Sequence, residues 1–251
     1  MAKAIILPAP PPLTPRNERQ REYQEALEMA QVVIGEGPAG TGKTYMAVSH
    51  AVSLLVEERV KRLVFTRPMV PAEDDPGALP GSIDEKFHPY FIPILEVLEQ
   101  LLTPKLVRQL MMEKVIIVAP LAVIRGRTFH RSCMVLDEAQ NTTPSQMKLF
   151  LSRIGERSQV IVNGDRQQSD ISGPSGLADA ARRLEGMAEV GHVVFQEQDI
   201  VRSELCRKIM QRYSNDHRPT GAFPSAGHRH HHVADIGALR DPETCGAQEP
   251  A

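Results

Sequence analysis

The sequence has no tryptophan, and aromatic residues make up only 4% of its 251 residues. Proteins that hold single strands by base stacking use aromatic side chains, so composition gives little support for that mode of binding. Cysteine is also scarce: Cys133, Cys206 and Cys245 are widely spaced and form no CxxC pair or disulfide framework. This usage is typical of a protein in a reducing compartment.

Charge of one sign and long apolar runs are also missing. The formal net charge is -2, so the chain has no overall excess of basic residues that would indicate nucleic-acid binding. A near-neutral net charge does not exclude a local basic groove. No apolar run approaches the ~18 residues that a membrane helix needs. The opening MAKAIILPAPPP has too short an apolar run and too many prolines for a signal peptide. We therefore predict a soluble, cytoplasmic protein with no membrane association.

What the sequence does have is one long segment of globular composition between two biased ends. Residues 1–13 are Pro-rich and predict an extended or disordered arm. Residues 214–251 are rich in Pro, Gly and His and predict a disordered tail. Four histidines between 228 and 232 could hold a metal, but an adventitious cluster is the better interpretation. Residues 14–213 are long enough for one well-buried core.

Short apolar, β-branched runs alternate with helical patterns between residues 14 and 213. The runs are apolar throughout, as expected of strands that are covered on both faces. This alternation predicts an α/β fold with a mainly parallel central sheet and right-handed crossovers. The predicted strands contain residues 32–34, 63–65, 115–118, 134–136, 160–162 and 193–195, and the predicted helices cover 43–57, 146–154, 177–184 and 201–213.

One predicted helix carries signals for both of its ends. Thr143 is a suitable N-cap, Pro144 suits the first helical position, and Gln146 completes a capping box. Gly155 suits the C′ position at the other end. We therefore expect a helix between Thr143 and Gly155.

A glycine-rich loop lies between the first predicted strand and the first predicted helix. Residues 37–44, GPAGTGKT, fit the phosphate-loop pattern GxxxxGK[ST] in the structural context that the pattern requires. Glycines let backbone N–H groups converge on phosphate oxygens, and the following helix directs its N-terminal dipole at the anion. We expect Lys43 to reach the β- and γ-phosphates of ATP and Thr44 to ligate Mg²⁺. A glycine-rich strand–helix turn with no ligand is the alternative. The predicted phosphate-binding residues are Gly37, Pro38, Ala39, Gly40, Thr41, Gly42, Lys43 and Thr44.

Two later strands are each followed by polar residues. Asp137 and Glu138 follow the run CMVL, and in a parallel sheet ligands bind beyond the carboxyl ends of the strands. We expect Asp137 to bind Mg²⁺, directly or through water, and Glu138 to polarise the hydrolytic water. After the run VIV, Gln168 is the first candidate for sensing the γ-phosphate and Asp165 the second. A plain polar loop is the alternative for this second cluster.

These segments together resemble the PhoH-like family of P-loop ATPases across residues 14–213. The matching blocks are GPAGTGKTY (37–45), TRP (66–68), LPG (79–81), PY (89–90), APLAVIRGRT (119–128), LDEAQNTTPSQMKLFLSRIG (136–155), GDRQQSD (164–170), SGL (175–177) and DIVR (199–202). The resemblance implies a P-loop NTPase (RecA-like) three-layer sandwich, similar to the first motor domain of superfamily 1 helicases. It also implies ATP hydrolysis, and some members of the family are linked to RNA handling.

The resemblance adds two residues to the nucleotide site and departs from the family in two places. It implies that Tyr45 binds nucleotide and that Gln20 contacts adenine. The segment 70–82 differs from the usual family sequence after TRP, and Arg202-Ser203 stands where the family has Arg-His. These departures leave the predicted ATP site unchanged.

A P-loop site without a supplied arginine tends to be slow, because such an arginine is worth about 10³–10⁵ in rate. Only about 40 residues follow Tyr213, so we expect no second motor domain in this sequence to supply one. The hypothesis is a homo-oligomer, such as a hexameric ring, in which Arg202 acts on a neighbouring subunit. The alternative is that Arg202 caps its own helix or forms an ion pair there.

Arg67, Arg125 and Arg127 follow or lie near predicted strand ends, where they could bind the phosphates of RNA or single-stranded DNA. Arginines at strand ends also pair with acids or bind the nucleotide, and this alternative stays open. Two other functions are possible: a P-loop kinase for a small molecule, and a nucleotide-binding module that does not hydrolyse ATP. The sequence has no obvious arginine-rich lid of the kind that small kinases carry, which favours the ATPase.

Overall fold

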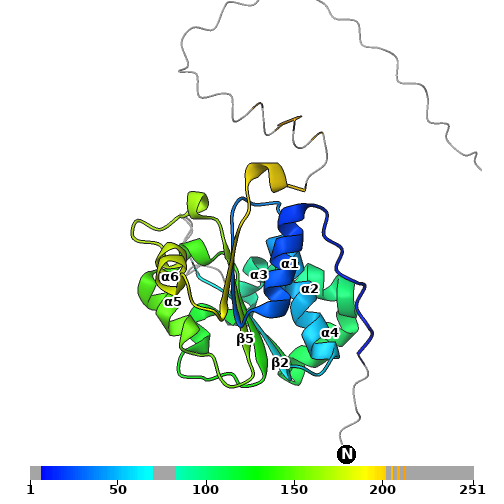
Figure 1. Ribbon diagram of the computed structural model, residues 1–251. Coiled ribbons are helices and arrows are strands. Elements are labelled where there is room, and N and C mark those ends of the chain that lie inside the picture. Colours follow the sequence, from blue (N-terminus) through cyan, green and yellow to red (C-terminus); the bar gives the residue numbers. More distant parts are fainter. Residues whose placement is uncertain (1–6, 70–82, 202–204, 206–207, 210–211, 213–251) are drawn as a thin grey trace, which may run out of the picture. The chain divides into compact units, whose positions relative to one another are not determined.

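A six-stranded, all-parallel sheet forms the centre of the protein, with the order β3-β2-β4-β5-β1-β6 (Figure 1). The computed structural model describes residues 7–69, 83–201, 205, 208–209 and 212. The strands are β1 (Val32–Glu36), β2 (Arg62–Arg67), β3 (Ile116–Pro120), β4 (Ser132–Leu136), β5 (Gln159–Gly164) and β6 (Val190–Val194). The predicted α/β fold with a parallel central sheet is confirmed.

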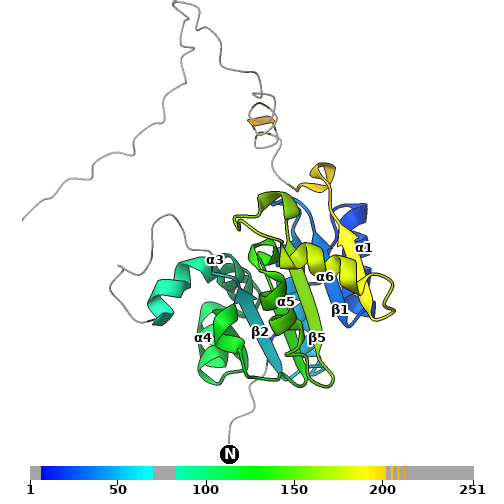
Figure 2. The same cartoon turned by 90° about the vertical axis from the view of Figure 1, so that its left-hand side faces the viewer.

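Helices cover both faces of the sheet and complete a three-layer sandwich (Figures 1 and 2). The helices α1 to α4 lie on one face, while α5 and α6 lie on the other and pack against each other. Their bounds are α1 (Glu18–Met29), α2 (Lys43–Val56), α3 (Ile83–Leu102), α4 (Pro104–Met112), α5 (Pro144–Leu151) and α6 (Gly176–Leu184). Among the described residues, none of the helices is both long and apolar enough to cross a lipid bilayer.

The apolar strands divide their side chains between two hydrophobic cores. In β4, Cys133 and Val135 join the core under α1–α4, whereas Met134 and Leu136 join the core under α5 and α6. Successive side chains of a strand point to opposite faces, so a strand between two helix layers has to be apolar at every position. Burial also raises the pKa of the Cys133 thiol to about 12. Cys133 is therefore a core residue and has no reactive thiolate at neutral pH.

Three helices and the bounds of two strands differ from the sequence-based expectation. The strand predicted to contain 115–118 begins at Ile116. The last strand covers 190–194 instead of centring on 193–195, because its edge position gives it a mixed pattern of exposure. Helices α1, α3 and α4 were not predicted. Helix α1 buries only three side chains, and α3 contains Pro89 and Pro93, which mask a helical pattern. The predicted helix 201–213 and the predicted tail 214–251 lie largely or wholly outside the described residues.

The capping box predicted for α5 is present, but the other end of the helix differs. Thr143 accepts a hydrogen bond from the Gln146 backbone N–H, and Pro144 is the first helical residue. The helix ends at Leu151 with Ser152 as its C-cap, so Gly155 is not at C′. Instead, the Gly155 N–H donates to Phe129 O at 2.8 Å, and a Cβ at Gly155 would lie 2.6 Å from that oxygen. The glycine is needed for this close approach of two backbones.

We predict that Gly155→Ala lowers the free energy of unfolding by about 1–3 kcal/mol, because the added methyl overpacks against backbone that cannot easily move. Gly173→Ala is the matched control, since a Cβ there meets nothing within 4 Å. Urea unfolding of both variants measures the difference. Equal unfolding midpoints would show that the close approach at Gly155 relaxes at no cost.

Candidate functional site

The loop between β1 and α2 has the backbone shape that its glycines allow. Gly37, Gly40 and Gly42 have φ values of 138°, 84° and 87°, in the region that favours glycine. At Gly37 a Cβ would also lie 2.4 Å from the backbone oxygen of Phe195. Helix α2 begins at Lys43, so the first unpaired N–H groups of the helix belong to the end of this loop. The loop is therefore a cradle whose backbone bends sharply, and at Gly37 and Gly42 it leaves no space for a Cβ.

Lys43 lies folded against its own loop. Its Nζ donates to Gly37 O at 2.6 Å, to Pro38 O at 2.8 Å and to the Thr41 hydroxyl at 3.1 Å. An ammonium group has three N–H donors, so these three acceptors engage all of them. Burial lowers the pKa of Lys43, while the nearby carboxylates of Asp165, Asp137 and Glu138 act in the opposite direction.

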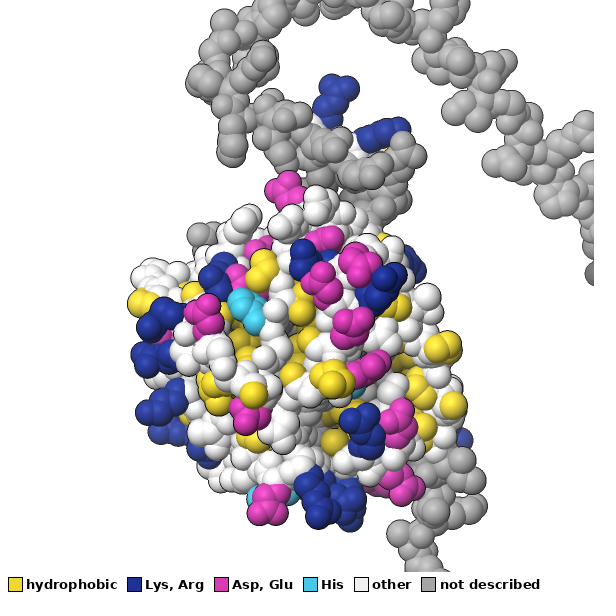
Figure 3. Space-filling model, in the orientation of Figure 1, with side chains coloured by type: hydrophobic (Ala, Val, Ile, Leu, Met, Phe, Trp, Pro, Cys, Tyr) yellow, Lys and Arg dark blue, Asp and Glu magenta, His cyan; other side chains and the backbone are white. Residues whose placement is uncertain are grey.

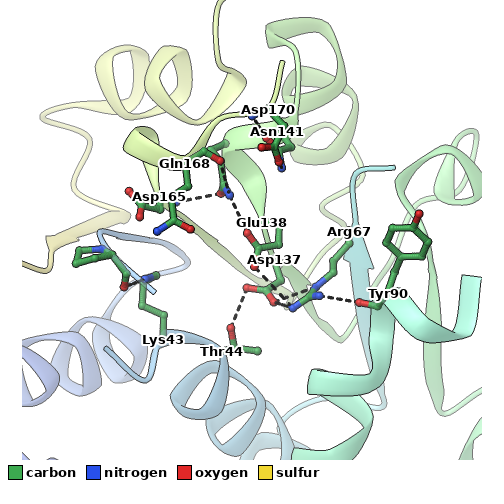
Figure 4. Close-up of polar contacts among 12 residues, drawn as sticks. Lys43, Thr44, Arg67, Tyr90, Asp137, Glu138, Asn141, Asp165, Gln168 and Asp170 are labelled. Atoms are coloured by element: carbon green, nitrogen blue, oxygen red, sulfur yellow. Dashed lines mark hydrogen bonds and ion pairs between the residues drawn. The ribbon is translucent and has the colours of Figure 1, made fainter. Parts of the chain in front are cut away.

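Asp137 directly follows β4 and is almost fully buried. Its backbone N–H donates to Thr66 O at 3.0 Å, which continues the β2–β4 ladder by one residue and fixes where the side chain begins. One carboxylate oxygen accepts a hydrogen bond from the Thr44 hydroxyl at 3.0 Å. The other accepts two from the Arg67 guanidinium, which also donates to Tyr90 O at 2.6 Å (Figure 4). A buried carboxylate is thus joined to α2 on one side and to β2 on the other.

Glu138 turns away from the strand direction. Its backbone is left-handed, with φ 55°, and its side chain is about half exposed. Its Oε2 accepts a hydrogen bond from Gln140 Nε2 at 2.7 Å, and its Oε1 lies 3.9 Å from Arg67 Nη2. The unusual backbone therefore directs one carboxylate toward the open side of the site while its neighbour Asp137 stays buried.

Five predicted residues of the phosphate loop and the residues of both polar strand ends meet around one cavity of about 230 Å³ (Figure 4), whereas Gly37, Pro38 and Thr41 are not among its lining residues. Asp165 and Gln168 reach it from the segment after β5. The lining residues are Ala39, Gly40, Gly42, Lys43, Thr44, Tyr45, Asp137, Glu138, Gly164, Asp165 and Gln168. Segments that are up to 129 positions apart in the chain (Ala39 to Gln168) are thus brought together at the carboxyl edge of the sheet.

Two other hollows are larger, but neither contains a predicted site residue of the phosphate loop or strand ends. One of about 720 Å³ lies beside α6 and β6, and one of about 560 Å³ lies between α5 and α6. Charged side chains in their walls pair locally: Asp179 with Arg182 and Arg183, and Arg166 and His192 with Glu36. Size alone therefore does not identify the functional site in this fold.

Other predicted residues lie outside the cavity. Gln20 lies against the phosphate loop, where its Nε2 donates to Thr41 O at 2.8 Å and its Oε1 accepts from Arg16 N at 2.8 Å. Arg125 and Arg127 are exposed in the connection from β3 to β4. Arg202 lies outside the described residues, so its action on a neighbouring subunit stays a prediction.

The structure also brings in residues that were not expected in this role. Arg67 was a candidate for binding nucleic-acid phosphates, but it pairs with the acid Asp137. This pairing is the alternative that we gave for arginines at strand ends. The sequence signal for this role was the block TRP (66–68), which places an arginine at the end of a predicted strand. Two further contacts had no signal in the sequence: the Val201 N–H donates to Gly40 O at 2.9 Å, and the Phe195 ring lies 5.8 Å from Lys43 Nζ.

The parallel sheet, the glycine cradle before α2 and the acidic end of β4 define a domain of the P-loop NTPase class. The PhoH-like protein family matches residues 12–214. Protein PhoH of Escherichia coli K12 is 43% identical over 207 residues, which are 81% of this chain and 58% of that protein. The PhoH-like protein of Mycobacterium tuberculosis H37Rv is 41% identical over 219 residues, 86% of this chain and 62% of that protein. The chain belongs to the PhoH-like family.

The chain spans about three fifths of the length of these curated relatives. Among solved structures, the large terminase of a thermophilic bacteriophage is similar with a TM-score of 0.47 and 13% identity, over 79% of this chain and 50% of that one. The Pif1 helicase of Candida albicans is similar with a TM-score of 0.40 and 16% identity, over 81% of this chain and 44% of that one.

We predict that Arg67→Met lowers the free energy of unfolding by about 3 kcal/mol or more, because it leaves the buried Asp137 carboxylate without its cation. Adding Asp137→Asn should recover part of this stability, since the second change removes the uncompensated charge. Arg21→Met is the control, because the pair of Arg21 with Glu18 is exposed and is worth about 0–1 kcal/mol. Thermal and urea unfolding measure all four chains, wild type included. A double variant less stable than Arg67→Met would contradict this account of Asp137.

Proposed function

We propose that this protein binds ATP with Mg²⁺ and hydrolyses it, and that hydrolysis is coupled to the handling of RNA or single-stranded DNA. One observation carries the first part: Thr44 at the start of α2 and Asp137 at the end of β4 are joined by a 3.0 Å hydrogen bond beside the glycine cradle. A hydroxyl and a carboxylate beside a phosphate-binding loop form a site for a metal-bound triphosphate.

The donor set fits Mg²⁺. Thr44 and Asp137 supply only oxygen, which is the ligand type that this hard cation prefers, and few protein ligands suit an ion that keeps several waters. Arg67 occupies the other oxygen of Asp137 and so leaves the oxygen that faces Thr44 available for the ion. When bound, Mg²⁺ would neutralise charge on the phosphates.

Each remaining side chain has a task that follows from its position. Lys43 would exchange the carbonyl oxygens of its own loop for phosphate oxygens, which are stronger acceptors because they are charged. Glu138 is the exposed carboxylate in the cavity and would orient and deprotonate the attacking water. Gln168, or Asp165, would contact the γ-phosphate from the segment after β5. Tyr45, which lines the cavity and is partly exposed, would contact the nucleotide.

We predict that Glu138→Gln lowers the ATP turnover rate by about 10²–10⁴-fold while ATP affinity is kept, because the variant removes the base and keeps the shape of the side chain. Glu25→Gln on the exposed surface of α1 is the matched control. Phosphate release without an added acceptor and titration with a labelled ATP analogue measure the two quantities. Release only with an added small molecule would favour the kinase, and binding without any release would favour the non-hydrolysing module.

Surface charge supports the nucleic-acid part of the proposal. Figure 3 shows Lys and Arg side chains along the side of α5 and α6 with acidic side chains among them, and side chains of both signs toward α1. Arg127 is exposed above the Phe129 ring, and its backbone oxygen accepts a hydrogen bond from Arg153, which follows α5. Arg125 and Arg127 are thus exposed arginines that could meet phosphates, while Arg67 is already engaged by Asp137.

We predict that Arg125→Ala and Arg127→Ala each weaken binding to RNA or single-stranded DNA regardless of sequence. The slope of log affinity against log salt concentration should become shallower by about 0.7 for each phosphate that the variant no longer neutralises. Arg21→Ala on α1 is the control, because it removes the same charge from the other face of the sheet. Fluorescence anisotropy across a salt series measures the slopes. Unchanged slopes in both variants would exclude these arginines from the interface.

A further inference from the structure

Gln140 is a buried polar residue beside the cavity that has no task in the mechanism proposed above. It follows Asp137 by three positions, in the short helical turn Ala139–Asn141, and only 2% of its surface is exposed. Its Nε2 donates to Glu138 Oε2 at 2.7 Å and to Gln168 O at 3.4 Å, and its Oε1 accepts from Asp165 N at 3.0 Å. One amide thus contacts the end of β4 and the segment after β5 simultaneously.

The surroundings hold this amide in place. A Cβ at Gly164 would lie 2.7 Å from Gln140 Oε1, so the glycine at the end of β5 makes room for the contact. The Gln140 backbone oxygen accepts hydrogen bonds from the hydroxyls of Ser169 at 3.2 Å and Ser175 at 3.0 Å. The backbone oxygen and the amide oxygen of Gln140 are thus both engaged by neighbouring groups, with the amide nitrogen directed at Glu138.

We propose that Gln140 is a positioning residue that aligns the Glu138 carboxylate with the segment 165–168, so that the water and the γ-phosphate are held in one geometry. This inference rests on the proposed ATPase function. Glu138 is exposed and has an unusual backbone, and the hydrogen bond from Gln140 is what ties its carboxylate to the segment that would sense the γ-phosphate. A misplacement of about 1 Å can cost on the order of 10²-fold in rate.

Glutamine suits this task because its amide is a donor and an acceptor at the same time. Glutamate could accept from Asp165 N but could not donate to Glu138. The neighbouring Asn141 uses the same chemistry farther along the chain: its Nδ2 donates to Asp170 Oδ2 and its Oδ1 accepts from Asp170 N, both at 2.8 Å. The Asn141 side chain thus fastens the same two segments together through Asp170, and only its backbone N–H contacts Glu138, at the Glu138 carbonyl oxygen at 3.1 Å. A change confined to the Asn141 amide therefore provides a matched control.

The test compares Gln140→Glu with Asn141→Asp in the full chain. Gln140→Glu keeps the size of the side chain and the acceptor for Asp165 N, but it has no donor for Glu138. We expect its kcat to fall by about 10–100-fold with the dissociation constant for an ATP analogue close to wild type. Asn141→Asp should affect thermal stability with kcat close to wild type. Equal kcat in Gln140→Glu and wild type, or an equal fall in the two variants, would overturn the proposal.

A double-variant cycle tests whether Gln140 acts through Glu138. In the Glu138→Gln background, adding Gln140→Glu should cause no further fall in residual turnover, because the group to be positioned is gone. A further fall by the factor seen in the wild-type background would overturn the proposal. If Gln140→Glu does not fold, Gln140→Met has a similar length and also lacks the donor. An inactive wild-type chain would reject the ATPase itself, whereas an active wild type with a fully active Gln140 variant would reject only this inference.

Discussion

The buried carboxylate of Asp137 is the point on which the rest of the site depends. It lies one residue beyond β4, and its two oxygens face in different directions, one toward Thr44 on α2 and the other toward Arg67 on β2. A buried carboxylate without a partner is costly, so the fold that buries Asp137 must also bring a cation to it. Arg67 meets this requirement from the neighbouring strand β2. The cation that stabilises the fold is therefore also what orients the oxygen available to a metal.

Two adjacent acids acquire opposite environments from a change in backbone direction. Asp137 continues the ladder of β4, while Glu138 adopts φ 55° and its carboxylate comes out to the cavity. A buried, ion-paired carboxylate suits a metal ligand, and an exposed one suits a base that has to exchange protons with water. Positive φ in a residue other than glycine is uncommon and costs energy, and such residues cluster at functional sites. In Glu138 this conformation brings the carboxylate to Gln140 Nε2 at 2.7 Å.

Local patterns predicted much of this arrangement, and contacts between distant segments account for the rest. The strand–helix alternation and the capping box at Thr143 each depend on residues that are close in the sequence, and the structure confirms both. The phosphate loop and the acidic strand end were predicted to meet because parallel strands end at one edge, and they line one cavity. The partner of Arg67 was not evident, since Asp137 lies 70 positions away and the pairing depends on strand order. Helix α1 escaped prediction because it is polar and contributes Tyr23 and Leu27 as its main buried apolar residues.

Strand order explains why the segment after β5 belongs to the site. The phosphate loop follows β1 and the acids follow β4, but these strands are not neighbours, because β5 lies between them. The gap that this leaves at the carboxyl edge has to be filled from β5, and Gly164, Asp165 and Gln168 fill it. The Gln140 side chain then connects the end of β4 with this segment. Its amide nitrogen donates to Glu138, and its amide oxygen accepts from Asp165 N. In a sheet where β1 and β4 were adjacent, neither that segment nor such a glutamine would have a place at the cavity.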